Sequence, residues 1–259
     1  MDKPTLLAVF AHPDDETVRS GGTLALLARR GVCVYLLTAT HGEAGSCGIP
    51  PLCRPDELAA LRERELACAC QMLGLQPPRF LGYRDGYLPQ ADPDKVVGEI
   101  VRVVREVRPQ VILTYGPDGI SGHPDHVVIG RLALRAYREA GNPRAYAEAG
   151  LPPYSPAKLY QMVLAKSVAE ATGLHALHSL PDEEISLTVD VSEVWDTKMA
   201  AICCHGTQHG VLPLREATPE QRRLFLASET FKLGTSQVAV PHPEHDMFDG
   251  LEPAVEAGQ

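Results

Sequence analysis

The 259-residue sequence has no apolar run that approaches the roughly 20 residues needed to span a bilayer. Its N-terminus passes from the apolar run 5–10 directly into acids, without the charged, apolar and small segments of a signal peptide. Basic residues are few, since 24 Lys and Arg stand against 33 Asp and Glu without forming a cluster. The phosphate backbone of a nucleic acid requires a basic face. We therefore expect a cytoplasmic protein with neither a membrane nor a nucleic-acid partner.

The cysteines also lack a recognisable metal or disulfide pattern. Seven is an odd number, no Cys-x-x-Cys motif occurs, and the chain is too long to need disulfide staples. We interpret most of them as small core residues. Cys47 and Cys53 flank a Gly/Pro loop, GSCGIPPLCRP, and the sequence leaves open whether they form a local disulfide.

Short apolar runs alternate with helical patterns through the first half of the chain. Four runs have the composition of buried strands: 5–10, 32–38, 79–83 and 111–115. Helical patterns separate or follow them at 22–31, 54–75, 92–109 and 124–140. Asp56 and Asp92 are plausible N-caps, and Gly74 is a plausible stop. Apolar strands that alternate with helices predict an α/β fold, a Rossmann-like doubly wound sheet that is mostly parallel.

The pattern loosens after Gly141. We expect strands at 158–165 and 184–191, a helix capped by Ser192 at 192–208, and an edge strand within 231–240. No repeat or linker interrupts the chain. The prediction is a single domain over 1–259, with a core over 1–140, an elaborated C-terminal part over 141–250 and a frayed tail over 251–259.

Two segments share an HPD triplet: AHPDDE over 11–16 and SGHPDHVVIG over 121–130. Each follows an apolar strand directly and precedes a helix. In a doubly wound sheet, ligands bind beyond the carboxyl ends of the strands, where the strand order reverses. If the strands 5–10 and 111–115 are neighbours there, the two motifs meet in one crevice.

Together the two motifs contain the ligands that a catalytic zinc site needs. Such a site takes three protein ligands and keeps one position open. A spacing of three places His12 and Asp15 on one side of a turn, and His126 could complete the set. Further acids and histidines remain for the proton transfers of metal-assisted hydrolysis: Asp14, Glu16, His123 and Asp125. One HPD turn alone could be an Asp that caps a helix, but two at equivalent points of one sheet favour a site.

The segments AHPDDE…GG and GHPDH, with the overall layout, resemble the LmbE-like (PIG-L) family of zinc-dependent N-deacetylases. Members act on N-acetylglucosaminyl and related amides, including intermediates of mycothiol and bacillithiol. The resemblance extends over most of the chain through 61–75, 80–88, 198–208 and 228–251. It implies Zn²⁺ as cofactor, with Fe²⁺ as the alternative, and a small acetylated amino sugar as substrate. Whether the protein forms a homo-oligomer stays open.

The resemblance also implies a role for each motif residue. It assigns three metal ligands: His12, Asp15 and His126. Asp14 would be the general base for the attacking water. His123 would stabilise the tetrahedral oxyanion or help protonate the leaving amine, and Asp125 would be hydrogen-bonded to tune it.

Four residues are candidates for contacting the substrate. Arg62 and Asp85 match family positions implicated in holding sugar hydroxyls, although Arg62 could instead pair with a helix acid and Asp85 could form a turn. Glu43 in THGEAG could also face the crevice. Arg19 stands where small or apolar residues are commoner in the family, so it could reach the crevice and alter substrate preference.

The remaining polar residues carry weaker signals. Ser121 occupies the position where some members have a tyrosine, which leaves open how the oxyanion is bound there. His205 and Gln208 fall on a helical pattern and are interpreted as a packed polar pair. We assign the other histidines to loops or the surface: His41, His175, His178, His209, His242 and His245.

We expect metal-dependent hydrolysis of an N-acetyl amide on a glucosaminyl-type small molecule, with release of acetate and a free amine. One alternative is an amidase for a bulkier amide, such as a thiol conjugate or an antibiotic precursor. Another is a non-catalytic sugar- or nucleotide-binding module. The sequence contains neither GxGxxG nor GxxxxGK[ST], which argues against nucleotide binding.

Overall fold

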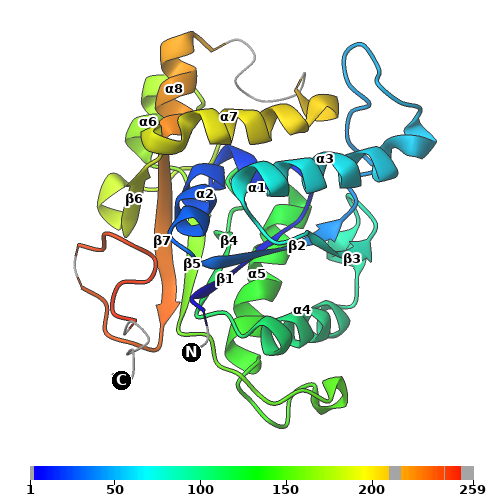
Figure 1. The fold of residues 1–259 in the computed structure, drawn as a ribbon, viewed down its shortest axis with the longest axis vertical. Coiled ribbons are helices and arrows are strands. Elements are labelled where there is room, and N and C mark those ends of the chain that lie inside the picture. Colours follow the sequence, from blue (N-terminus) through cyan, green and yellow to red (C-terminus); the bar gives the residue numbers. More distant parts are fainter. Residues whose placement is uncertain (1–2, 210–216, 242, 252–259) are drawn as a thin grey trace.

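The computed structural model describes residues 3–209, 217–241 and 243–251. Its centre is a seven-stranded sheet with the order β3-β2-β1-β4-β5-β7-β6 (Figure 1). The strands are β1 (Thr5–Phe10), β2 (Cys33–Thr40), β3 (Arg79–Tyr83), β4 (Val111–Tyr115), β5 (Lys158–Val163), β6 (Leu187–Asp190) and β7 (Ser228–Ser236). Strands β1 to β5 pair in parallel, and β7 runs antiparallel to both of its neighbours. The predicted α/β class and mostly parallel sheet are confirmed.

Helices cover both faces of this sheet (Figure 1). One face carries α2 (Gly21–Arg29), α3 (Leu58–Leu73) and α7 (Trp195–Cys204), which contact one another. The other face carries α4 (Pro93–Val107) and α5 (Pro124–Glu139). The short α1 (Asp15–Val18) follows β1, while α6 (Lys166–Thr172) and α8 (Pro219–Ala227) pack together near β7. Among the described residues, no helix is both long and apolar enough to cross a membrane.

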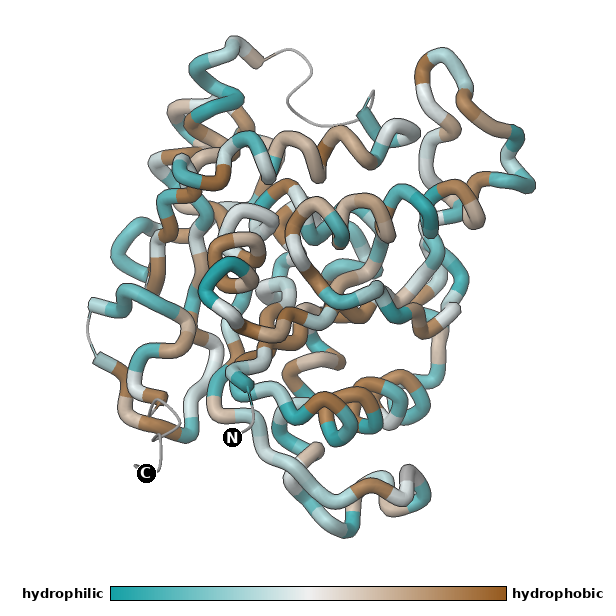
Figure 2. Tube along the Cα trace, in the orientation of Figure 1, coloured by the Kyte–Doolittle hydropathy of each residue, from teal (hydrophilic) through white to brown (hydrophobic). Residues whose placement is uncertain are grey.

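The hydrophobic core lies on both sides of the central strands. Every residue of β1 and of β4 is buried, as expected for parallel strands between two helical layers. Figure 2 shows apolar residues concentrated along these strands, whereas α4 alternates between apolar and polar positions. The carboxyl ends of β1 and β4 are thereby fixed in a rigid frame.

The predicted helix ends agree with the structure in part. The Asp92 side chain accepts the Asp94 N–H at 2.9 Å, and Gly74 ends α3 in the left-handed conformation at φ 76°. The predicted caps Asp56 and Ser192 are wrong, because each lies in a short 3₁₀ turn and the α-helix begins a few residues later. A 3₁₀ turn has nearly the same sequence pattern as a first α-helical turn.

The predicted edge strand is also wrong. β7 lies between β5 and β6, and β6 forms the edge of the sheet. The strand begins at Ser228, before the predicted range, and its Glu229 is fully buried and paired with Lys198 at 2.7 Å. β5, β7 and β6 therefore extend the sheet of the predicted core, while the domain boundaries themselves stay a prediction. His242 and residues 252–259 of the predicted tail lie outside the described residues.

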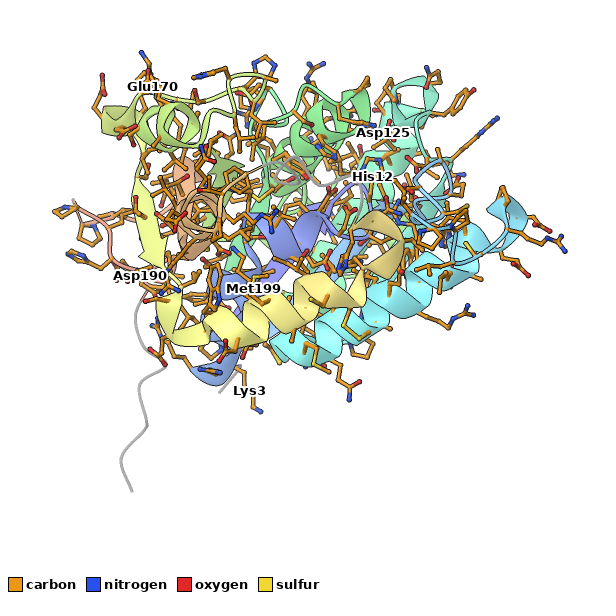
Figure 3. All side chains as sticks on the ribbon, turned by 90° about the horizontal axis from the view of Figure 1, so that it is seen from above. Lys3, His12, Asp125, Glu170, Asp190 and Met199 are labelled. Carbon is orange, nitrogen blue, oxygen red and sulfur yellow. A yellow bond between two sulfur atoms is a disulfide. The ribbon has the colours of Figure 1, made fainter. Side chains whose placement is uncertain are left out.

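One disulfide connects the helices of the same face. Cys68 in α3 and Cys204 at the end of α7 are bonded, with a Cα–Cα distance of 5.8 Å. Figure 3 shows these two helices running side by side. Cys47 and Cys53 are free thiols. The prediction that most cysteines are core residues is wrong, because Cys70 alone among the seven is buried. The bridge was missed because its cysteines are 136 residues apart in sequence and only helix packing brings them together.

Candidate functional site

The two HPD motifs meet at one edge of the sheet. β1 and β4 are parallel neighbours, with Leu6 opposite Val111, and the motifs follow their carboxyl ends. The chain passes from β1 to β2 on one side and reaches β4 on the other, so the strand order reverses here. The crevice that we expected from strand order is present.

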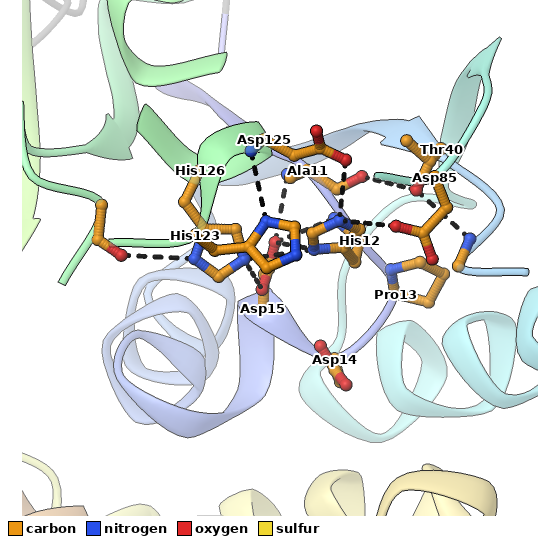
Figure 4. Close-up of polar contacts among 12 residues, drawn as sticks. Ala11, His12, Pro13, Asp14, Asp15, Thr40, Asp85, His123, Asp125 and His126 are labelled. Carbon is orange, nitrogen blue, oxygen red and sulfur yellow. Dashed lines mark hydrogen bonds and ion pairs between the residues drawn. The ribbon is translucent and has the colours of Figure 1, made fainter. Parts of the chain in front are cut away.

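His12, Asp15 and His126 converge in this crevice (Figure 4). His12 Nδ1 lies 3.1 Å from His126 Nε2 and 3.7 Å from an Asp15 oxygen. The other Asp15 oxygen lies 3.3 Å from His126 Nε2. Asp15 is held in place because it accepts the backbone N–H groups of Ala11 and His12 at 3.1 and 2.8 Å.

The far nitrogen of His12 faces two carboxylates. Its Nε2 lies 3.0 Å from Asp85 and 3.3 Å from Asp125. Asp125 is fixed by the backbone N–H groups of Gly86 at 2.8 Å and Leu88 at 3.1 Å. A proton on Nε2 therefore donates to a carboxylate, which leaves the Nδ1 lone pair directed at the space between Asp15 and His126.

His126 is oriented in the same way from its other side. Its Nδ1 lies 3.2 Å from both the Gly119 carbonyl and the Ser121 hydroxyl. Its ring stacks on Tyr115, with centroids 4.2 Å apart and planes at 9°. Tyr115 is the last residue of β4, and the sequence reasoning missed it. The available signal was an aromatic residue at the carboxyl end of β4, the strand that precedes the second motif.

The resulting donor set fits a transition-metal ion. Two imidazole nitrogens 3.1 Å apart beside a carboxylate can share one proton or bind one cation together. Nitrogen and carboxylate donors suit zinc and iron. Burial lowers the pKa of His12, but the carboxylates of Asp125, Asp85 and Asp15 outweigh it and raise this pKa to about 10. The field at this point thus favours a positive charge.

Other ligand sets overlap with this one around His12. Ligand atoms of His12, His123 and His126 lie within 4.8 Å of one another, as do those of His12, Asp85 and Asp125. In the second set, both carboxylates lie at Nε2 of His12, where they can accept its proton. Asp85, which was predicted to contact sugar hydroxyls, therefore also contacts His12, one of the candidate metal ligands.

Asp14 points away from this cluster (Figure 4). Its carboxylate forms an ion pair with Arg62. Its backbone has φ 105°, an unfavourable conformation for a residue other than glycine, of the kind that persists at functional sites. An Asp14 oxygen lies 3.0 Å from Arg62 Nη2. Burial raises the pKa of Asp14 to about 6, although Arg62 opposes the shift. A carboxylate with a pKa near neutrality can both take and return a proton.

Arg62 is shared among several acceptors around Asp14. It donates to the carbonyls of Gly42, at 2.8 Å, and of Pro13. A Cβ on Gly42 would lie 2.3 Å from the Arg62 guanidinium, so only glycine fits beneath it. The alternative in which Arg62 pairs with an acid of its own helix is wrong, because its ion pair is with Asp14 of the first motif.

His123 lies above the cluster, close to His12 and His126. Its Nδ1 accepts the backbone N–H of Asp125 at 3.2 Å, which caps α5. The bond expected from the Asp125 side chain to His123 is thus replaced by one from its backbone, because the carboxylate faces His12. Burial and the nearby His12 lower the pKa of His123.

Glu16, His205 and Gln208 form a layer behind Asp14. The fully buried Glu16 accepts the Asp14 N–H at 3.0 Å and contacts His205 Nε2 at 2.7 Å. The prediction that His205 and Gln208 form a pair is wrong. The His205 side chain contacts Glu16, and the Gln208 side chain donates to the Ser46 carbonyl at 2.8 Å. Gln208 also borders the crevice, a position that no sequence pattern indicated.

Glu43 and Arg19 support the backbone around the site. Glu43 accepts the Asp85 N–H at 2.9 Å. Arg19 is buried, and it donates to the carbonyls of Phe225 and Ser228 and to the Thr230 hydroxyl. Their contact with substrate, like that of Arg62 and Asp85, stays a prediction.

Two cavities open on the site. One of about 290 Å³ is polar, and its further lining residues include Arg62, Asp85 and His123. The other, of about 230 Å³, adds a group of apolar side chains to the polar residues of the centre. Four residues border both: Asp14, Asp15, His126 and Gln208. A substrate held at this centre can extend in two directions of different polarity.

Comparisons with known proteins agree with this geometry. The model of the PIG-L family, described as GlcNAc-PI de-N-acetylase, matches residues 7–137. A 1D-myo-inositol 2-acetamido-2-deoxy-alpha-D-glucopyranoside deacetylase from Kineococcus radiotolerans is 35% identical, with 98% of this chain and 85% of that protein covered. The enzyme of the same name from Rhodococcus opacus is 38% identical over 82% of this chain and 84% of its own length.

A solved structure shares the fold. The N,N'-diacetylchitobiose deacetylase from Pyrococcus horikoshii superposes with a TM-score of 0.72 at 24% identity, covering 90% of this chain and 84% of that one. At this identity the likeness concerns the fold alone. Because the family model spans both HPD motifs and the relatives match nearly the whole length, the chain belongs to the PIG-L family.

Proposed function

We propose that this protein hydrolyses the acetamide of a glucosaminyl compound and releases acetate and the free amine. The observation that carries the proposal is the meeting of the two HPD motifs, which places Asp14 beside a convergent histidine and carboxylate cluster. The relatives described above are named for a 2-acetamido-2-deoxy-glucopyranoside linked to myo-inositol. A glucosaminyl inositol is therefore the proposed substrate, and the polar cavity of about 290 Å³ receives its sugar.

A divalent metal ion, zinc with ferrous iron as the alternative, would be held by His12, Asp15 and His126. The bound ion would supply a Lewis acid that polarises the amide carbonyl and lowers the pKa of water. Asp85 and Asp125 hold the far side of His12, and partners of this kind orient metal-binding histidines. Because Asp85 and Asp125 can accept a proton from Nε2 of His12, its Nδ1 can bind the ion. This arrangement supports the set with Asp15 and His126 over the set with Asp85 and Asp125.

Asp14 is the proposed general base, and Arg62 holds its carboxylate. The water oxygen bonds to the acyl carbon, the C–N bond breaks, and the amine nitrogen receives the proton that Asp14 removed. His123 is the proposed group that stabilises the oxyanion or assists protonation of the amine. Substrate contacts are proposed for Arg62, Asp85, Glu43 and Arg19. Location in the cytoplasm and the absence of nucleic-acid partners remain predictions.

The substitution Asp14→Asn tests this function. It keeps the shape of the side chain and removes its ability to take a proton, so acetate release should fall by at least about 100-fold. Elemental analysis should find the metal content of the purified variant unchanged, because Asp14 is not a proposed ligand. Asp56→Asn, an exposed Asp in a 3₁₀ turn, serves as the control and should retain full activity.

Turnover retained by Asp14→Asn would overturn the assignment of the base. A wild-type protein that contains no stoichiometric zinc or iron and releases no acetate would instead favour the non-catalytic binding module.

A further inference from the structure

The second cavity of the site has no role in the function proposed above. Its wall includes apolar side chains from five separate segments: Val18, Ile120, Met162, Leu177 and Phe225. Arg19 also borders it, but its Nη groups bond to the Phe225 and Ser228 carbonyls and the Thr230 hydroxyl. The cavity is therefore suited to an apolar group.

Much of this wall comes from the C-terminal part of the chain. Met162 lies in β5, Leu177 follows α6, and Phe225 lies in α8. All three are outside residues 7–137, which the family model matches. Three of the five apolar residues of this wall thus lie outside the part of the chain that the family model matches.

An amide at the centre has two substituents that leave the carbonyl in opposite directions. One is the nitrogen with its sugar, whose hydroxyls suit the polar cavity. The other is the acyl chain, which bonds directly to the reacting carbon. Because Asp14, Asp15 and His126 border both cavities, the acyl chain of an amide placed there extends into the apolar one.

The size of the cavity exceeds what an acetyl group needs. A methyl group occupies roughly the volume of one water molecule, about 30 Å³. The cavity has about 230 Å³, enough for a straight chain of several carbons. Ile120 helps to shape it at a backbone φ of 62°, where a β-branched residue is rare, and it is 6% exposed.

We propose that this cavity is an acyl pocket, and that the protein hydrolyses glucosaminyl amides whose acyl group is longer than acetyl. The inference rests on the proposed function, because it concerns the acyl side of the same amide. Water adds to the acyl carbon and the C–N bond breaks as before, so the products are a short-chain fatty acid and the free amine.

The experiment compares kcat/KM for the methyl glycosides of N-acetyl-, N-butanoyl- and N-hexanoylglucosamine. Burying one methylene group is worth up to about fourfold in kcat/KM. We expect the butanoyl compound to equal the acetyl compound or to exceed it by up to about tenfold. A lower kcat/KM for butanoyl than for acetyl would overturn the acyl pocket. If the wild type hydrolyses none of the three, the proposed function fails instead.

Variants of Leu177 locate the effect. This side chain is only partly buried, so Leu177→Trp can narrow the cavity without overpacking the core. The ratio of butanoyl to acetyl kcat/KM should fall at least fivefold in Leu177→Trp. The ratio of hexanoyl to acetyl kcat/KM should not fall in Leu177→Ala. Leu224→Trp, on the exposed side of α8, should leave both ratios unchanged. Ratios that do not respond to Leu177 would contradict the assignment.

The hexyl glycoside of N-acetylglucosamine tests the competing occupant. If Leu177→Trp slows this compound selectively and has no effect on N-hexanoyl hydrolysis, the cavity receives the aglycone and the acyl assignment is wrong.

Discussion

At the residue scale, three consecutive acids have three different sets of partners. Asp14 pairs with Arg62, Asp15 faces His12 and His126, and Glu16 contacts His205. The left-handed backbone of Asp14 turns its side chain away from Asp15, so the two carboxylates do not compete for the same partner. This division is what the proposed function requires, with Asp15 as a metal ligand and Asp14 as the base.

Arg62→Lys should reduce kcat/KM by about 10- to 100-fold. The guanidinium serves Asp14 and the carbonyls of Gly42 and Pro13 at once, which a lysine ammonium on a flexible stem cannot reproduce. Each buried hydrogen bond to a charged group contributes about 1.5–3 kcal/mol. Steady-state kinetics check the result against Arg64→Lys, an exposed position of the same helix. Wild-type kcat/KM in Arg62→Lys would show that Asp14 needs no such support.

At the element scale, the end of α7 is held against α3 and the site. Cys204, which is bonded to Cys68, is the last residue of α7, and His205 follows it directly. His205 then reaches Glu16, and Gln208 reaches the loop at Ser46. The disulfide therefore fixes the segment from which two residues approach Asp14.

Cys204→Ser should lower the free energy of unfolding of the oxidised protein by about 2–5 kcal/mol, because the bridge closes a long loop and limits the unfolded chain. Urea unfolding measures the change. Cys203→Ser, at the adjacent exposed free thiol, should stay within about 0.5 kcal/mol of wild type. If a reducing agent leaves the wild-type unfolding midpoint where it was, the bridge contributes nothing to stability.

At the scale of the whole molecule, a buried ion pair of the C-terminal part is connected to the N-terminal helix α2 through the hydrogen bonds of its glutamate. Lys198 in α7 and Glu229 in β7 are both fully buried and 2.7 Å apart. Glu229 also accepts the N–H groups of Gly22 and Thr23 at the start of α2, at 2.9 and 2.7 Å. Burial lowers the pKa of Lys198, while the charge of Glu229 opposes that shift. The pair joins the C-terminal part to the first helical layer.

Lys198→Met should destabilise the protein by about 3–5 kcal/mol, because it leaves the Glu229 charge buried without a counter-ion. The double variant Lys198→Met/Glu229→Gln should recover part of this loss, since the glutamine is neutral and its amide oxygen still accepts one of the two N–H groups at the start of α2. Lys166→Met, at an exposed ion pair, should change stability by less than about 1 kcal/mol. Denaturant unfolding compares the stabilities of the three variants. If Lys198→Met is as stable as the double variant, an unpaired Glu229 charge is not the cause of the loss.

The local sequence was enough to predict the alternation of strands and helices, and it placed each HPD motif directly after a strand. The meeting of the motifs was predicted on the condition that β1 and β4 are neighbours, which the structure confirms. These features depend on local apolar patterns and on the rule that ligands bind where strand order reverses. That His12, Asp15 and His126 come together follows from the same facts. Their roles, and that of Asp14, stay predictions that the geometry supports.

Only the tertiary structure decided which partner each polar side chain takes. Arg62 and Asp14 are 48 residues apart in sequence, and Arg19 and Phe225 are 206 apart. The position of β7, the Cys68–Cys204 bridge and the apolar cavity likewise join segments that no local pattern relates. Such contacts arise from the packing of whole helices against the sheet, which the spacing of residues along the chain does not encode.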